Sequence, residues 1–377
     1  MSANHERALD ALLRRGRLRT LEAAHGIDFT SNDYLGLAKS RELAQAVERA
    51  IARGVPVGAG GSRLLRGNHD EHEALEQEAA RFFGGETALF FGGGFIANSA
   101  LLSTLPSRGD LIAYDEYIHA SAHDGMRLSK AKAVAVRHND AQAFEDAITA
   151  WRRDGGTGQP WIVIESIYSM DGDRAPIVEL FDIARRHEAM LIIDEAHATG
   201  VFEPEGRGLA ADLEGNDNVI SLHTCGKALG AMGALVIAPR VIKDFLVNRG
   251  RPFIYATAPS PLIAATVRAA IEICRTQPER RERLMALVAH AERELTAKTR
   301  FTPSGSQILP LIVGGDVPAV ALAKSMQSRG YDIRAIRPPT VPEGTSRLRL
   351  TITLNVEEAH ITRLVDDIAE AEAENAA

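Results

Sequence analysis

Two short apolar segments that end in reactive side chains constrain this chain more than any other feature. The first, residues 191–197, brings Asp194 to its end, and the second, residues 219–230, brings Lys227. Each segment is a buried-strand pattern that stops abruptly at polar groups. A carboxylate and an amine placed at the ends of neighbouring strands indicate a built site rather than two unrelated loops.

The same two segments also carry an imidazole, His197, and a hydroxyl, Thr224. Together, these four groups are what an enzyme that uses pyridoxal phosphate (PLP) needs. An amine forms the Schiff base, a carboxylate pairs with the pyridinium nitrogen, and small hydroxyls with glycine amides hold the phosphate. The pattern therefore predicts PLP as the cofactor.

The remaining strand candidates support an open α/β sheet. Most are continuous apolar runs without alternation, which is typical of parallel strands that helices cover on both faces. Amphipathic helices are expected between them, at 141–153 and 177–187. The seven expected strands are 87–91, 110–114, 133–136, 161–165, 190–194, 219–223 and 233–238.

The length of 377 residues suits one large domain and a smaller one. We expect an N-terminal arm at 1–38, a large α/β domain at 39–269 and a small C-terminal α+β domain at 270–377. The arm should contain an Arg-rich helix over 5–22. For the last third of the chain we expect a long helix at 261–298, strands at 308–313 and 347–352, and helices at 317–329 and 356–374.

Composition excludes several classes of function. The net charge of −7, without a long basic run, gives no support to nucleic-acid binding. Two cysteines without a C-x-x-C motif fit a reducing compartment. The N-terminus lacks a signal-peptide core, and no apolar stretch reaches membrane-helix length. We therefore expect a cytoplasmic protein without nucleic-acid or membrane partners.

In an open parallel sheet, ligands bind beyond the carboxyl ends of the strands. Five of the expected strands are followed there by polar or glycine-rich turns, among them Gly92–Asn98, which suits a phosphate. Each element also has an ordinary interpretation, because a glycine run can be a plain turn and Asp194 can cap a helix. His69 and His72 have the spacing of a metal pair, but no further ligand lies near them in the sequence, so we expect no metal.

Two nucleotide-binding motifs are missing. The glycine turn does not match the G-x-G-x-x-G fingerprint of dinucleotide enzymes, which disfavours a dehydrogenase. The segment around Lys227 is not a P-loop, since Ser221 stands where the first glycine belongs.

With these residues in place, the chain resembles the α-oxoamine synthases, a family of fold type I (aspartate-aminotransferase-like) PLP enzymes, nearly from end to end. Five segments look like family-wide signatures and a sixth like one branch of the family. These segments are 31–37, 58–64, 169–173, 194–200, 224–227 and 336–350.

The resemblance implies a role for each matching residue. Lys227 would bond covalently to the cofactor, Asp194 would pair with the pyridinium nitrogen and His119 would stack on the ring. The other expected cofactor-binding residues are Gly94, Phe95, Ser169, His197, Thr224 and Thr257, the last from a partner subunit. The expected substrate residues are Arg19, Asn32, Thr340 and Arg349, with Arg349 for the amino-acid carboxylate.

The resemblance also implies an acyltransferase reaction. The branch suggested by 336–350 condenses L-alanine with a pimeloyl thioester, on CoA or on an acyl carrier protein, with loss of CO₂, in biotin biosynthesis. The family forms homodimers with shared active sites. A basic patch on the arm, at residues 14–19, could bind either phosphate-bearing carrier, or could be a solvated helix face.

Alternatives stay open at this point. The nearest is a glycine-using sister enzyme, 2-amino-3-ketobutyrate CoA ligase or 5-aminolevulinate synthase. A PLP aminotransferase would share the lysine and the aspartate but not the C-terminal segment. A PLP-binding regulatory domain would need an attached DNA-binding module, for which the sequence leaves no room.

Overall fold

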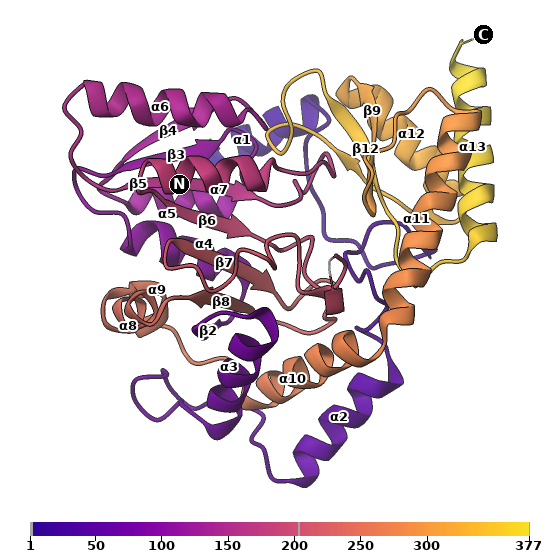
Figure 1. Cartoon of the computed structure of the whole chain (residues 1–377). Coiled ribbons are helices and arrows are strands. Elements are labelled where there is room, and N and C mark those ends of the chain that lie inside the picture. Colours follow the sequence, from indigo (N-terminus) through magenta and orange to yellow (C-terminus); the bar gives the residue numbers. More distant parts are fainter. Residues whose placement is uncertain (1–2, 203, 377) are drawn as a thin grey trace. The chain divides into compact units, whose positions relative to one another are not determined.

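The computed structural model describes residues 3–202 and 204–376, and the chain divides into two compact units (Figure 1). Unit 1 comprises the residues up to Tyr34, the segment Met170–Asp173 and the residues from Glu282 onward. Unit 2 comprises Leu35–Ser169 and Arg174–Arg281. The expected domain boundaries, between residues 38 and 39 and between residues 269 and 270, remain predictions.

Unit 2 is built on a seven-stranded sheet with the order β2-β8-β7-β6-β5-β3-β4. Only β8 runs antiparallel to its neighbours. The other four strand pairs, from β7 to β4, are parallel and confirm the expected mainly parallel sheet. The strands are β2 (Thr87–Phe91), β3 (Leu111–Asp115), β4 (Lys132–Val136), β5 (Pro160–Glu165), β6 (Met190–Asp194), β7 (Val219–Thr224) and β8 (Ala234–Ala238).

Helices cover both faces of this sheet. The helices of unit 2 are α2 (Arg41–Ala52), α3 (Asp70–Phe83), α4 (Gly94–Thr104), α5 (Ala120–Leu128), α6 (Ala141–Arg153), α7 (Ile177–Arg186), α8 (Arg240–Arg249), α9 (Arg251–Ile254) and α10 (Pro261–Thr276), with a 3₁₀ turn η1 (Pro204–Gly206). Local sequence sets their starts: Asp140, for example, accepts a hydrogen bond from Ala143 N at 3.0 Å and so caps α6.

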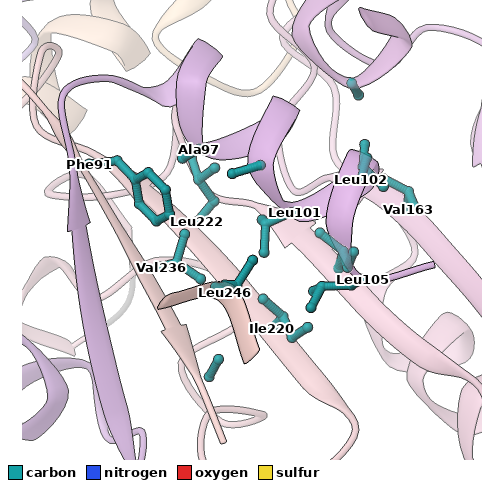
Figure 2. Packing of buried hydrophobic residues seen from close by; sticks show 14 of the residues in the cluster. Phe91, Ala97, Leu101, Leu102, Leu105, Val163, Ile220, Leu222, Val236 and Leu246 are labelled. Atoms are coloured by element: carbon teal, nitrogen blue, oxygen red, sulfur yellow. The ribbon is translucent and has the colours of Figure 1, made fainter. Parts of the chain in front are cut away.

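Two hydrophobic cores lie on opposite faces of the sheet because successive strand side chains alternate in direction. In β5, Val163 packs in the core under α4, whereas Ile162 and Ile164 pack in the core under α6 and α7. Figure 2 shows the first core, where Leu101 of α4 lies among strand residues such as Ile220. The apolar runs of the sequence are therefore buried from both sides, as their lack of alternation indicates.

Unit 1 contains two small sheets and the terminal helices. Strands β1 (Ile27–Asp28) and β10 (Tyr331–Asp332) pair in parallel, and β11 (Ala335–Ile336), β12 (Ser346–Thr351) and β9 (Ile308–Gly314) form an antiparallel sheet in that order. The helices are α1 (Ala3–Arg14), α12 (Asp316–Ser328), α13 (Glu358–Ala376) and most of α11 (Pro278–Lys298), whose first turn belongs to unit 2.

Two helix predictions are wrong in their limits. The arm helix ends at Arg14 instead of Glu22, because Gly16 adopts a left-handed conformation (φ +65°) that favours glycine and ends the helix. The expected long helix at 261–298 is two helices, α10 and α11, since Pro278 disfavours a helical conformation at the preceding Gln277.

Within residues 3–202 and 204–376, no helix is both long enough and apolar enough to cross a bilayer.

Candidate active site

The carboxyl ends of three neighbouring parallel strands bring polar side chains to one edge of the sheet in unit 2. Glu165 ends β5 and lies opposite Asp194, which ends β6. Thr224 ends the next strand, β7. The topology thus places these residues where open α/β sheets bind ligands.

Asp194 is a buried carboxylate with two donors of its own. Its Oδ1 accepts a hydrogen bond from Ala196 N at 2.9 Å, and its Oδ2 accepts one from Asn98 Nδ2 at 2.7 Å. Asn98 also donates to Ser121 Oγ at 3.0 Å, which holds the amide in place. A charged group this buried needs such partners, and their positions fix the direction in which the carboxylate faces.

His119 is held as a neutral ring at the start of α5. Its Nδ1 accepts a hydrogen bond from Ser121 N at 3.2 Å and lies 2.7 Å from Ser121 Oγ. Burial lowers the pKa of His119 below its usual 6.5, and the positive charge of Lys227 lowers it further against the opposing effect of Asp194. Because Nδ1 accepts, the neutral ring carries its proton on Nε2 and can donate from there.

Glu165 is a second buried carboxyl group beside Asp194. Its Oε2 accepts from Ser169 N at 3.2 Å, while its buried Oε1 has no hydrogen-bond partner in the described residues. Burial raises the pKa of Glu165 well above its usual 4.5, and the neighbouring charge of Asp194 adds to this effect. Glu165 therefore keeps its proton to a higher pH than an exposed carboxyl group does.

Lys227 lies half-buried in the loop that joins β7 to β8. Hydrogen bonds from Cys225 N to Gly233 O and from Ala231 N to Cys225 O, both 2.9 Å, close this loop. Ala228, next to the lysine, is fully buried, so the surroundings of Lys227 are crowded. The charge of Lys227 acts on both His119 and Glu165, so the three groups share one electrostatic site.

A cradle for an anion lies at the start of α4. The N-cap Gly93 provides no side-chain cap, so the first backbone N–H groups of the helix remain available, including those of Gly94 and the half-exposed Phe95. A Cβ built on Gly94 would lie 2.7 Å from Thr224 Cγ2. The helix start and the end of β7 thus approach so closely that only glycine fits between them.

The remaining expected cofactor residues of unit 2 occupy three places. His197 is buried in the turn that follows β6, and Ser169 lies half-buried four residues after Glu165. Thr257 is exposed, and the adjacent Ala258 N donates to Gly61 O at 2.8 Å. His197 follows the end of β6 and Ser169 follows the end of β5, so both lie at the edge of the sheet where Asp194 lies. Thr257, in contrast, is exposed on the surface of unit 2.

The four expected substrate residues all lie in unit 1 and form two pairs. Arg349 Nη2 donates to Asn32 Oδ1 at 3.1 Å. Arg19 Nη2 donates to Thr340 Oγ1 at 3.0 Å. These residues come from distant parts of the sequence, so their pairing is produced by the fold.

Cys225, two residues from Lys227, is fully buried, and burial raises the pKa of its thiol far above the usual value. A thiol in this environment is inert, because the thiolate is the reactive form.

Sequence reasoning missed Asn98 and Glu165 as site residues. Asn98 is a polar residue in the otherwise apolar first turns of α4, four positions after Gly94, which places both on one side of the helix. Glu165 ends an apolar strand in the same way as Asp194 does, so the same pattern was present. What the sequence lacked was the register that puts the two carboxyl groups side by side.

The described donor set suits a particular kind of group. Backbone N–H groups at a helix start, as at Gly94, are suited to a phosphate. A buried carboxylate such as Asp194 is suited to a protonated ring nitrogen, and an amine such as that of Lys227 to an aldehyde. A Cβ at position 94 would clash with the methyl group of Thr224, so the close approach of the helix start to β7 requires glycine there. These residues therefore fit a phosphorylated pyridine aldehyde.

Comparison with known proteins supports this assignment. The family of aminotransferases of class I and II matches residues 24–368. A putative 8-amino-7-oxononanoate synthase of Geobacillus kaustophilus is 42% identical over 349 residues, covering 91% of this chain and 88% of the relative. An 8-amino-7-oxononanoate synthase of Chromobacterium violaceum is 40% identical over 370 residues and covers 95% of each chain.

Solved structures give the same result. Serine palmitoyltransferase from S. paucimobilis with bound PLP has a TM-score of 0.89 at 26% identity, covering 99% of this chain and 98% of that one. An 8-amino-7-oxononanoate synthase from Francisella tularensis has a TM-score of 0.78 at 28% identity, covering 93% and 99%. The chain thus belongs to the aminotransferase class I and II family and, within it, to the α-oxoamine synthases, which are acyltransferases of fold type I with pyridoxal phosphate as cofactor.

Proposed function

We propose that this chain is an 8-amino-7-oxononanoate synthase, which joins L-alanine to a pimeloyl thioester with loss of CO₂ and release of the thiol in biotin biosynthesis. The observation that carries the proposal is the shared site of Asp194, His119 and Lys227 in a chain about two-fifths identical to synthases of that name over nine-tenths of its length.

The proposed cofactor contacts follow from the donor set. Lys227 bonds covalently to the aldehyde carbon, and Asp194 holds the proton on the ring nitrogen. The Gly94 and Phe95 amides bind the phosphate together with Thr224. The ring oxygen is the partner of Ser169 and His197. The ring face is covered by His119.

When bound, PLP supplies a ring that takes up the electron pair left at the α carbon of the amino acid. The amine of Lys227 would act as the base that takes the proton from that carbon. Asp194 favours the protonated ring nitrogen, and a carboxylate about 4 Å away contributes on the order of 4 kcal/mol at an effective dielectric of about 20.

His119 is suited to the acyl-transfer step. The neutral ring donates from Nε2 because Ser121 occupies Nδ1. A fixed donor aimed at the thioester oxygen stabilises the negative charge that develops there when the carbon–carbon bond forms. A protonated, mobile imidazole would be held less firmly, so the cap geometry of α5 supports this role.

The two pairs of unit 1 serve substrate binding in this proposal. Arg349, steadied by Asn32 and by Thr351 Oγ1 at 2.8 Å, binds the carboxylate of L-alanine. Arg19 and Thr340 bind the acyl substrate. A guanidinium group has five N–H bonds in a planar fork, which suits the recognition of a carboxylate or a phosphate.

We also propose a homodimer in which Thr257 reaches the phosphate of the partner's cofactor. The support is a surface of unit 2 that exposes large apolar side chains near Thr257, including Leu65 at 83% and Tyr255 at 71%. The hydrogen bond from Ala258 N to Gly61 O joins these two loops. Exposed apolar side chains of this size are typical of an interface.

The sister branches differ mainly in the amino acid. One methyl group in a pocket contributes about 1–3 kcal/mol, so alanine and glycine are separated by a small margin. The higher TM-score of serine palmitoyltransferase, 0.89 against 0.78, favours L-serine as the second amino acid to test.

The test is thiol release from pimeloyl-CoA by the purified PLP-loaded protein with L-alanine, glycine or L-serine. The proposal predicts release that depends on L-alanine. Release with glycine or L-serine alone would assign the chain to a sister branch. If none of the three amino acids gave release although the spectrum shows a lysine-bound cofactor, the proposal of pimeloyl-CoA as the acyl donor would be contradicted.

A further inference from the structure

Unit 1 contains an open cavity of about 540 Å³ between the N-terminal arm and helix α12. This volume lies within the range of roughly 300–1,000 Å³ that is usual for sites of small-molecule ligands. Leu18 of the arm and Val320 of α12 contribute apolar surface to its wall, and most of the charged residues in the lining are cationic. The site described above makes no use of most of this lining.

Four cations line the cavity against one carboxylate. The cations are Arg19, Lys324, Arg334 and Arg337, and the carboxylate is Glu22. Arg334 is neutralised in part, since it contacts Glu22 and donates from Nε to Asp332 Oδ1 at 3.0 Å. The excess positive charge of the cavity is therefore carried mainly by Arg19, Lys324 and Arg337.

Lys324 is the most available of these cations. It is exposed on α12 and forms no ion pair within the residues that the structure describes. Arg19 uses only one of its five N–H groups, on Thr340. Both side chains can therefore turn to an anion without giving up an ion pair.

The arm wall of the cavity is fixed by Arg17. Its Nε contacts Asp316 Oδ2 and its Nη2 contacts Glu343 Oε2, each at 2.7 Å. These two ion pairs hold the arm against the start of α12. They also withdraw Arg17 from the basic patch that the sequence shows at residues 14–19, and leave Arg19 as the arm's cation in the cavity.

The charge and the size of the cavity select the ligand. An acyl-chain carboxylate carries one negative charge and is far smaller than the cavity. A phosphate carries up to two charges, and guanidinium and ammonium groups are its usual partners. The mixed lining also suits a phosphate that continues into a less polar chain, as in phosphopantetheine.

We propose that this cavity binds the phosphate-bearing end of the acyl carrier, that is, a phosphate joined to pantetheine, whether in CoA or on an acyl carrier protein. The inference rests on the proposed function for the identity of the carrier, but the binding itself is measurable without turnover. Lys324 and Arg19 are the principal phosphate contacts.

The experiment compares Lys324→Glu with a matched control, Arg293→Glu, in the PLP-loaded protein. Arg293 is likewise an exposed cation of unit 1, on α11, and lies outside the cavity. Calorimetry with CoA should show a dissociation constant raised at least about tenfold in Lys324→Glu, since a charge reversal removes one attraction and adds one repulsion. The control should bind CoA as the unchanged protein does.

Kinetics then separate the two possible sources of the phosphate. Lys324→Glu should raise the KM for a pimeloyl donor without lowering kcat, and should not affect a truncated pimeloyl thioester that lacks phosphate. An effect with pimeloyl-CoA alone assigns the cavity to the CoA nucleotide, and an effect with the pimeloyl-carrier protein as well assigns it to the phosphopantetheine phosphate.

Three results would overturn the proposal: unchanged CoA binding in Lys324→Glu, equal weakening in Arg293→Glu, or an equal rise of KM for the truncated thioester. Failure of the proposed function has a different signature. In that case the unchanged protein would release no thiol from any donor, while the calorimetric comparison would still test the cavity.

Discussion

The protonated state of Glu165 makes a prediction that can be worked out from the structure. In Glu165→Gln, an amide replaces the acid with nearly the same shape. The amide oxygen can accept from Ser169 N in place of Oε2, and the amide nitrogen takes the position of Oε1, which has no partner in the described residues. The substitution therefore removes a titrating group without removing a hydrogen bond.

The sign of the pH effect follows from the raised pKa. Between the usual value of 4.5 and the higher folded value, the folded chain holds a proton that the unfolded chain has lost. Stability from this group is thus complete below 4.5 and declines as the pH rises toward the folded pKa. One proton corresponds to about 1.4 kcal/mol per pH unit. As the pH rises from 5.5 to 7.5, Glu165→Gln should therefore gain stability relative to the unchanged protein, by at most that amount per pH unit.

The assay is urea unfolding of the cofactor-free proteins, followed by circular dichroism at one protein concentration and several pH values. Glu145→Gln is the matched control. Hydrogen bonds from Arg186 and His187 lower the pKa of Glu145, so its stabilising effect is complete above 4.5 and constant across this range. The carbonyl stretch of protonated carboxyl groups in the infrared spectrum should be weaker in Glu165→Gln than in the unchanged protein. Glu195, whose pKa burial raises to about 8, should still contribute to this band. If the free energies of unfolding of Glu165→Gln and of the unchanged protein changed in parallel with pH, Glu165 would not hold an additional proton in the folded chain.

The remaining predictions concern the site and the core. Lys227→Ala should still bind PLP, without the lysine-bound absorbance, and should release no thiol; wild-type turnover would contradict the proposed role. Gly94→Ala should weaken PLP binding about tenfold or more in a titration, because its Cβ would press on Thr224 within 2.7 Å and overpacking costs about 1–3 kcal/mol. His119→Asn should slow thiol release about a hundredfold at unchanged cofactor absorbance, and a change in cofactor binding alone would assign it a different role. Leu101→Ala should lower the free energy of unfolding by about 2–5 kcal/mol, since this side chain is fully buried between α4 and the sheet.

Much of unit 2 could be predicted from the sequence because its strands are buried on both faces. A continuous apolar run such as β6 has no other stable place in a protein of this size, and its polar end follows directly. The resemblance to the α-oxoamine synthases then identified the residues around Lys227 as candidate site residues. The pattern failed where a single backbone feature decides: Gly16 ended the arm helix, and Pro278 divided the long one.

The electrostatic character of the site could not be predicted. It depends on register and burial, which place Glu165 beside Asp194 and raise the pKa of Glu165. The cationic cavity of unit 1 is similar, since Arg19, Lys324 and Arg337 come together only in the folded chain. Pairings between distant segments are set by tertiary packing, and no local pattern contains them.

The central claim is that the chain joins the α carbon of L-alanine to an acyl group and removes the alanine carboxyl group. The most direct measurement is mass spectrometry of the product formed from pimeloyl-CoA and L-alanine labelled with ¹³C at either the carboxyl or the methyl carbon. The account predicts a product that keeps the methyl label and the nitrogen, with the carboxyl label recovered entirely as CO₂. A product that keeps the carboxyl label, or pyruvate in place of a condensed product, would contradict it.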